Sequence, residues 1–110
     1  MLVSELKHID CIELVTNIFN DKKISEFYIS DLFSNVITRM KVTNMCLITT
    51  RVSINSIAIA KLQNMACIIF CESLQIDEEL ISKAKEQEVT IFKTSKTSFE
   101  LAKELMEDNE

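Results

Sequence analysis

The 110-residue chain contains neither glycine nor proline, although average usage predicts about a dozen of the two together. Every turn must therefore be made by residues that carry a Cβ atom, and glycine cannot supply positive φ. The phosphate-binding loops of dinucleotide-binding proteins and of P-loop NTPases both need glycine at fixed positions. The sequence excludes both loops, and no other stretch of the chain forms a complete catalytic set.

The length corresponds to one domain, which we expect to span residues 1–110. Hydrophobic residues make up 47% of the chain, which is enough to build a buried core. The longest apolar runs, 66–71 and 57–60, are too short to cross a bilayer. Residues 1–10 lack the pattern of a signal or transit peptide. We therefore predict a cytoplasmic protein with no membrane partner.

The formal net charge is −5, and acidic residues gather near the C-terminus. We interpret that acidic end as a solvated helix terminus. A protein that binds nucleic acid in general needs a basic patch or stripe, and the sequence has none. The charge distribution therefore predicts no nucleic-acid partner.

The four cysteines favour small buried hydrophobes over a metal site. Cys67 and Cys71 lie at the two ends of an apolar run, whereas zinc ligands are usually spaced along a turn. His8 is the only histidine, three positions before Cys11. We predict reduced thiols, no metal and no cofactor, with a redox-active thiol as the alternative.

Three strand-then-helix units follow one another from residue 44 onward. Short apolar runs predict strands at 45–49, 66–71 and 89–92. Each is followed by a helix-start signal: Ser53, Asp77 and the capping box of Thr97 and Glu100. Such alternation is typical of right-handed crossovers in a parallel sheet. We predict an α/β fold of three layers, with a mostly parallel sheet and helices on both faces.

The N-terminal part has a shorter, mixed pattern. It predicts a short helix within 2–9, two strands within 11–19 and 24–29 at one edge of the sheet, and a helix over 30–40. Apolar spacing also predicts the inward faces of two later helices, namely Ile54, Ile57, Ala58 and Leu62, and Phe99, Ala102, Leu105 and Met106. Without glycine, we expect the helices to end at Asn44, Asn64 and the pair Gln87 and Glu88, because asparagine tolerates positive φ best after glycine.

Ligands of open α/β sheets gather beyond the carboxyl ends of the strands. In this chain those ends are rich in hydroxyl groups and carry cations such as Arg51, which could hold a phosphate or carboxylate at helix N-termini. The alternative is that the hydroxyls simply cap helices and that Glu72 is an exposed loop acid. The candidate ligand-binding residues are Ser30, Asp31, Thr50, Arg51, Asn55, Glu72, Thr94, Ser95 and Ser98.

No serine or cysteine has an adjacent base in the sequence, and His8 is far along the chain from these loops. Neighbouring acids such as Glu78 and Glu79 occupy a helix start rather than forming a catalytic pair. We therefore predict no catalytic residues and no enzyme activity.

Residues 21–34 resemble the segment that names the DRTGG domain family. Asp21-Lys22, then Ser25, then Tyr28 to Ser34 follow the family pattern, with Lys22 in place of the arginine, Ser25 in place of the threonine, and Glu26-Phe27 in place of the two glycines. The similarity continues through an asparagine-led helix at 55–60, a strand-to-helix unit at 68–79 and a helix start at 94–102.

The resemblance implies a stand-alone regulatory or assembly domain that commonly pairs with itself and has no established catalytic activity. Family members also occur beside CBS domains, in some pyrophosphatases and beside phosphotransacetylase, and they resemble the N-terminal domain of HPr kinase. Stand-alone members often accompany hydrogenase and sensor-kinase genes, which implies a signalling or hydrogenase-associated protein partner. We therefore predict a homodimeric interaction module, and as the alternative a sensor that binds a nucleotide or other anion at the carboxyl ends of the strands.

Overall fold

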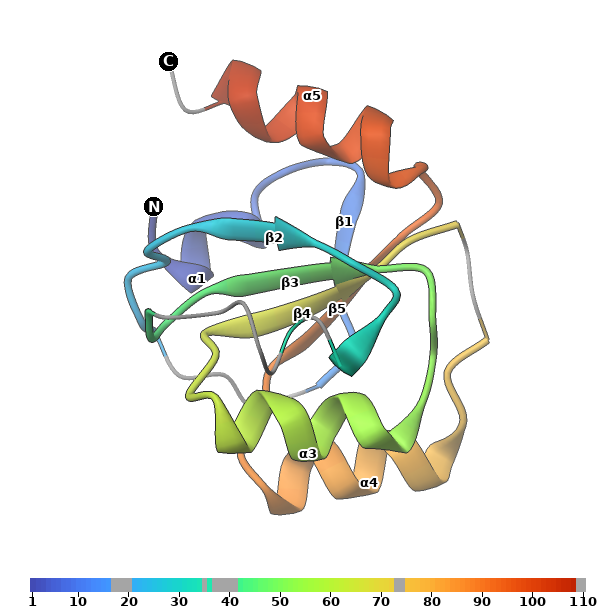
Figure 1. Cartoon of the computed structure of the whole chain (residues 1–110). Helices are drawn as coiled ribbons and strands as arrows, with labels where there is room; N and C mark the ends of the chain where they lie inside the picture. The colour runs from blue at the N-terminus through green and yellow to red at the C-terminus, as the bar shows by residue number, and fades with distance from the viewer. Residues whose placement is uncertain (17–20, 35, 37–41, 73–74, 109–110) are drawn as a thin grey trace.

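The computed structural model describes residues 1–16, 21–34, 36, 42–72 and 75–108. Within them, five strands form one sheet in the order β1-β5-β4-β3-β2 (Figure 1). Strands β2 to β5 are parallel, and β1 runs antiparallel to β5. The predicted α/β class with a mostly parallel sheet is confirmed. The strands are β1 (Ile12–Leu14), β2 (Phe27–Ile29), β3 (Cys46–Thr49), β4 (Cys67–Phe70) and β5 (Ile91–Thr94).

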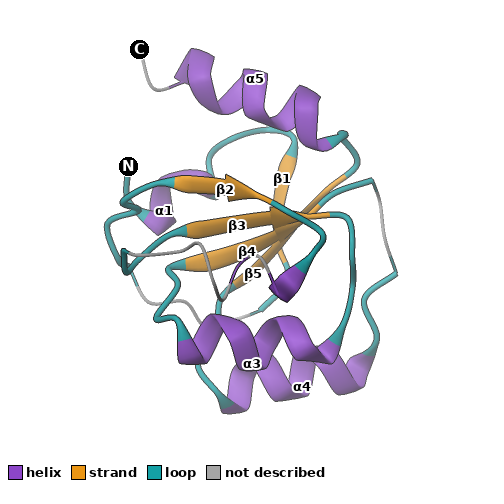
Figure 2. Cartoon of the chain, viewed as in Figure 1, coloured by secondary structure: helices purple, strands orange, loops and turns teal. Residues whose placement is uncertain are grey.

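The helices cover both faces of the sheet, as predicted (Figure 2). Their bounds are α1 (Val3–Leu6), α3 (Ile54–Leu62), α4 (Glu78–Glu86) and α5 (Ser98–Asp108). Phe33, Ser34 and Val36 also have helical backbone, and the rest of the helix predicted up to residue 40 lies outside the described residues. No helix in the described ranges is long and apolar enough to cross a membrane.

The two N-terminal strands lie at opposite edges of the sheet, so their predicted placement at a single edge is wrong. β2 pairs with β3, whereas β1 crosses to the far side and pairs with β5. Ile91 N donates to Thr16 Oγ1 (3.3 Å), and Lys93 forms an ion pair with Glu13 (3.2 Å). These contacts join segments from opposite ends of the chain, which no local pattern of residues reveals.

The strands alternate side chains between two buried clusters, as a period of two requires. Leu47, Ile68 and Ile91 face α3 and α4, whereas Cys46, Ile69 and Phe92 face α1 and α5. The central strands β3 and β4 are buried along their whole length. Burial on both faces therefore stiffens the part of the sheet whose ends carry the candidate site.

The predicted inward faces of α3 and α5 are partly wrong. Ile57 is buried as predicted, but Ile54, Ala58 and Leu62 are exposed on α3, where Ser56, Ile59 and Ala60 are buried instead. On α5, Leu101 and Leu105 face the sheet, while Phe99 is 79% exposed and Met106 is 71% exposed. Apolar residues lie on all sides of α3, so the spacing of apolar residues along the sequence could not identify the face that packs on the sheet.

The helix caps and turns follow the predicted chemistry. Ser53 Oγ accepts from Asn55 N (3.2 Å), and Asp77 Oδ1 accepts from Leu80 N (2.8 Å). The capping box is reciprocal: Glu100 N donates to Thr97 Oγ1 (3.2 Å), and Thr97 N donates to Glu100 Oε1 (2.9 Å). Positive φ occurs at the predicted Asn44, Asn64 and Glu88, and also at Glu72, which was not predicted.

Candidate functional site

The parallel strands bring the predicted segments to one edge of the sheet, at the arrowheads of Figure 1. Ser30 and Asp31 follow β2, Thr50 and Arg51 follow β3, and Glu72 comes just after β4. Thr94 ends β5 and Ser95 follows it. Asn55 lies in the first turn of α3, and Ser98 begins α5. We call this set the carboxyl edge, and its role in ligand binding stays a prediction.

Asp31 is the centre of a hydrogen-bond network that joins β2 to β3. Its Oδ1 accepts from Thr49 Oγ1 (2.7 Å) and from Thr50 N (2.7 Å). Its Oδ2 accepts from Thr50 Oγ1 (2.6 Å). Thr49 Oγ1 in turn accepts from Arg51 N (3.1 Å). The network fixes the segment after β3 against the segment after β2.

The charge of Asp31 is stabilised by these donors. Desolvation by burial raises its pKa, but the hydrogen bonds from Thr50 and Thr49 and the nearby Arg51 charge outweigh it. The pKa of Asp31 therefore lies below its ordinary value, and the group is a carboxylate at neutral pH. A fixed negative charge thus lies in the middle of the predicted anion site.

Two hydroxyl groups of the edge already bond to the backbone. Thr94 Oγ1 accepts from Lys96 N (3.2 Å), and Ser30 Oγ accepts from Leu32 N (3.2 Å). This favours the capping interpretation for these residues. In the described part of the chain, the side chains of Asn55, Ser95 and Ser98 make no hydrogen bond. They are therefore among the polar groups of the edge that remain available to a ligand.

Two further features define the edge electrostatically. The Arg51 guanidinium lies over the Phe33 ring, 5.4 Å from its centroid, which is a cation–π contact. Glu72 N donates to the Lys96 carbonyl (2.9 Å) and so ties the end of β4 to the loop after β5. The edge therefore carries both signs of charge, with Arg51 as a cation and Asp31 and Glu72 as acids. Burial, followed by the charges of Glu72 and Asp31, raises the pKa of Cys71 to about 11.

A hollow of about 250 Å³ lies beside this edge, between the N-termini of α3 and α4. Its lining combines the cap residue Ser53 with the acids Asp77 and Glu79. Asp77 already accepts a hydrogen bond from Leu80 N. Two carboxylates at this position oppose an anionic ligand, so the hollow does not extend the predicted anion site.

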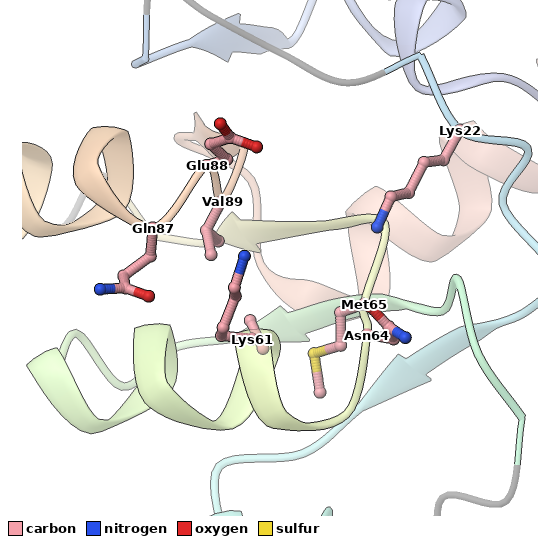
Figure 3. Close-up of a pocket in the computed structure, with 8 residues that line it drawn as sticks. Lys22, Lys61, Asn64, Met65, Gln87, Glu88 and Val89 are labelled. Carbon is pink, nitrogen blue, oxygen red and sulfur yellow. The ribbon is translucent and has the colours of Figure 1, made fainter.

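A second polar pocket, of about 150 Å³, lies at the opposite, amino edge of the sheet (Figure 3). The side chains of Lys22 and Lys61 reach it from the loop before β2 and from the last turn of α3. Sequence reasoning missed this pocket. The signal that could have found it was the positive φ predicted for Asn64 and Glu88, because both residues line it.

The first part of the segment that carries the family resemblance, Asp21 to Ser25, lies at this amino edge. Asp21 accepts from Ser4 N (2.9 Å) and from Ser4 Oγ (3.0 Å), so it anchors α1. Ser25 Oγ donates to the Thr43 carbonyl (2.6 Å) and holds the loop that enters β3. These residues of the altered motif thus join elements of the fold, away from the carboxyl edge.

The described residues contain no group of three potential metal ligands. Cys46 and Cys67 are directly opposite one another on β3 and β4 and are fully buried. Burial, with Cys67 next in effect, raises the pKa of Cys46 well above its ordinary value. A buried thiol with a raised pKa is a poor nucleophile, which argues against a redox role for Cys46.

The sequence model of the DRTGG domain matches residues 8–107, and the chain belongs to this family. A solved structure of similar fold contains the CBS and DRTGG domains of the regulatory region of Clostridium perfringens pyrophosphatase, complexed with the activator diadenosine tetraphosphate. The two share 13% sequence identity with a TM-score of 0.67, over 92% of this chain and 44% of that one. No curated protein matches the chain at a significant level.

Proposed function

We propose that the chain is a non-catalytic regulatory or protein-interaction module that acts as a homodimer in the cytoplasm. Its membership of the DRTGG family supports the regulatory role. The pyrophosphatase structure offers a parallel, because there a DRTGG domain is part of a regulatory region that is complexed with an activator. The chain spans 44% of that protein's solved length, so it corresponds to part of such a region.

The carboxyl edge supports a non-catalytic role. Its most connected acid, Asp31, spends both carboxylate oxygens on Thr49 and Thr50. Its lowered pKa makes Asp31 a weak general base, and its hydrogen bonds give it a structural role between β2 and β3. His8 is the histidine that serine or cysteine catalysis would need. It follows α1, where its amide donates to the Glu5 carbonyl (3.2 Å).

Exposed apolar side chains on ordered elements carry the homodimer proposal. Phe99 and Met106 are 79% and 71% exposed on α5, and Ile29 is 50% exposed on β2. Apolar groups in water cost free energy, and burying them between two copies recovers roughly 25 cal/mol per Å². A second copy of the chain is the partner that is always present at equal concentration.

Size-exclusion chromatography with light scattering tests the dimer directly. At tens of micromolar we expect a mass of twice the monomer, falling toward the monomer on dilution. A constant monomer mass over this range would refute the homodimer.

The family resemblance also leads us to propose a signalling or hydrogenase-associated protein partner. The test is whether the purified chain binds candidate proteins from its gene neighbourhood.

A small-molecule sensor is the second candidate function. The observation that favours it is the Arg51 guanidinium held over Phe33, which places a cation beside an aromatic ring. The Arg51 cation could bind the phosphate of a nucleotide or another anion through its charge, with Asn55, Ser95 and Ser98 as further polar contacts.

Thermal shift with ATP, AMP, pyrophosphate and inorganic phosphate tests the sensor. A stabilisation that Arg51→Ala abolishes and Lys61→Ala retains would place the ligand at the carboxyl edge. The reverse result would place it in the amino-edge pocket of Figure 3. No change in melting temperature with any of these compounds would remove the hypothesis for phosphate-bearing ligands.

A further inference from the structure

The outer side of β2 is an open edge of the sheet. On the inner side, Cys46 N donates to the Glu26 carbonyl (2.9 Å) and Ser30 N donates to the Ile48 carbonyl (3.1 Å). Since alternate residues of a parallel strand direct both backbone groups to the same neighbour, Phe27 and Ile29 direct theirs outward. Among the described residues, none pairs with this outer side of β2.

Exposed apolar side chains lie along the same edge. Ile29 is 50% exposed on β2, and Leu32 is 54% exposed just beyond it. Leu2, 39% exposed, forms a bridge with Lys23 ahead of β2. Natural edge strands are usually protected by lysine, proline or a covering element. Residues 26–30 contain neither lysine nor proline, so this edge is suited to pairing with another strand.

We propose that β2 pairs antiparallel with β2 of a second copy, about a two-fold axis at Tyr28. The inference rests on the proposed homodimer and names its interface. With this axis, Phe27 lies opposite the partner's Ile29 and exchanges both backbone hydrogen bonds with it. The two Tyr28 residues lie opposite one another as a pair without hydrogen bonds. The two sheets then form one continuous sheet, and the two-fold symmetry closes the assembly.

The side chains favour this register over two others. An axis at Tyr28 sets Glu26 opposite the partner's Ser30, so no like charges meet. An axis at Glu26 sets two carboxylates directly opposite one another, which is destabilising. An axis at Ile29 sets Phe27 against the partner's Asp31, whose charge is already committed to Thr49 and Thr50.

The proposed pairing also extends the apolar surface on both faces of the sheet. Tyr28 packs toward the α3 and α4 side, and Phe27 packs toward the α1 and α5 side. The proposed axis is perpendicular to the sheet and therefore keeps each face continuous across the dimer. Aromatic and β-branched pairs opposite one another contribute about 0.2–1 kcal/mol each to strand pairing.

Disulfide trapping tests the register. In a Cys11→Ser background, Tyr28→Cys should give a disulfide-linked dimer on mild oxidation, because the opposed Cα atoms of such a pair are about 4.5 Å apart. Glu26→Cys is the matched control, since its two copies would be about 13 Å apart and should not cross-link. Equal cross-linking of both variants, or cross-linking of Glu26→Cys alone, would overturn the register.

Charge placement tests the edge itself. Ile29→Lys should weaken dimerisation at least tenfold, whereas Leu62→Lys, which puts the same charge on the exposed face of α3, should leave it unchanged. If the protein is dimeric but Ile29→Lys dimerises normally, the interface is wrong and the homodimer stands. If the wild-type chain is monomeric, the proposed function fails as well.

Hydrogen exchange of the wild-type chain gives a readout that does not depend on whether a variant folds. The outward amides of Phe27 and Ile29 should be protected at high protein concentration and exchange faster on dilution, while the amide of Leu47 in β3 stays protected. If the amides of Phe27 and Ile29 exchange at one rate at all concentrations of a dimeric sample, the edge is free and the inference is refuted.

Discussion

Thr50 donates both its amide and its hydroxyl to the Asp31 carboxylate, over 2.7 and 2.6 Å. The residue that follows β2 is thereby bonded to the residue that follows β3, and the two strands are adjacent and parallel. The side chain that the sequence suggested as a ligand contact acts in the structure as a link between neighbouring strand ends. These hydrogen bonds therefore hold this part of the carboxyl edge in place without a ligand.

Replacing this carboxylate should destabilise the fold in a pH-dependent way. Asp31→Asn leaves Thr50 N with a poorer acceptor and should lower the free energy of unfolding by about 1 kcal/mol at neutral pH, since the site is exposed to water. The folded-state pKa of Asp31 is lowered, so its contribution is full above the unfolded-state pKa and is lost as pH falls through the folded-state pKa. The difference in unfolding free energy between the two proteins, measured in urea, should therefore begin to shrink as pH falls below about 4 and vanish below the folded-state pKa of Asp31. A difference that grows on acidification would contradict this assignment.

The capping box of α5 should contribute to the stability of the fold, because α5 covers one face of the sheet. Thr97→Ala removes the acceptor for Glu100 N and should cost about 1 kcal/mol of stability. Thr97→Ser keeps the hydroxyl and is the control, with a cost expected to be much smaller. Equal losses for the two variants, measured by thermal unfolding, would show that the hydroxyl is not the stabilising group.

The absence of glycine leaves left-handed backbone on residues that tolerate it poorly. Glu88 has φ of 59° at the end of α4, and Asn64 has φ of 54° at the end of α3. Glu88→Gly should raise stability by about 1 kcal/mol, because glycine adopts this conformation without a Cβ clash. Asn64→Gly should gain less, since asparagine already tolerates it. Glu86→Gly, within α4, should destabilise instead. A loss on Glu88→Gly would indicate that its side-chain interactions outweigh the strain.

The packed face of α3 can be tested with two aliphatic truncations. Ile57 is fully buried against the sheet, whereas Leu62 is 72% exposed. Ile57→Ala should cost about 2–5 kcal/mol through lost burial and a cavity. Leu62→Ala should change stability by less than about 0.5 kcal/mol. Comparable losses of unfolding free energy for the two variants in chemical denaturation would support the inward face that was predicted from periodicity.

The fold class could be predicted because its signals are local. Ser53, Asp77 and Thr97 mark helix starts through their own side-chain chemistry, and the short apolar runs mark buried strands. The turn positions were equally local, since Asn64 and Glu88 had to replace glycine. Glu72 was missed because it follows a strand and not a helix, so no helix end pointed to it; its amide donates to the Lys96 carbonyl.

What could not be predicted depends on contacts between distant residues. The position of β1 is set by bonds such as that from Ile91 to Thr16, which no spacing along the chain encodes. The inward face of α5 was half right: Leu105 is buried, but Phe99 and Met106 are exposed. Of the candidate site, the meeting of the three strand ends after residue 44 followed from the predicted topology. The commitment of Asp31 to two threonines, and the pocket between Lys22 and Lys61, needed coordinates.

Small-angle X-ray scattering of the wild-type chain tests the central claim of a regulatory homodimer most directly, because it reports mass and shape together. One copy has a Cα radius of gyration of 12.4 Å. At high protein concentration we predict forward scattering that corresponds to two copies and a radius of gyration well above the monomer value, as edge-to-edge association of two sheets requires. Scattering from a single copy, with a radius near that of the monomer at every concentration, would contradict the account.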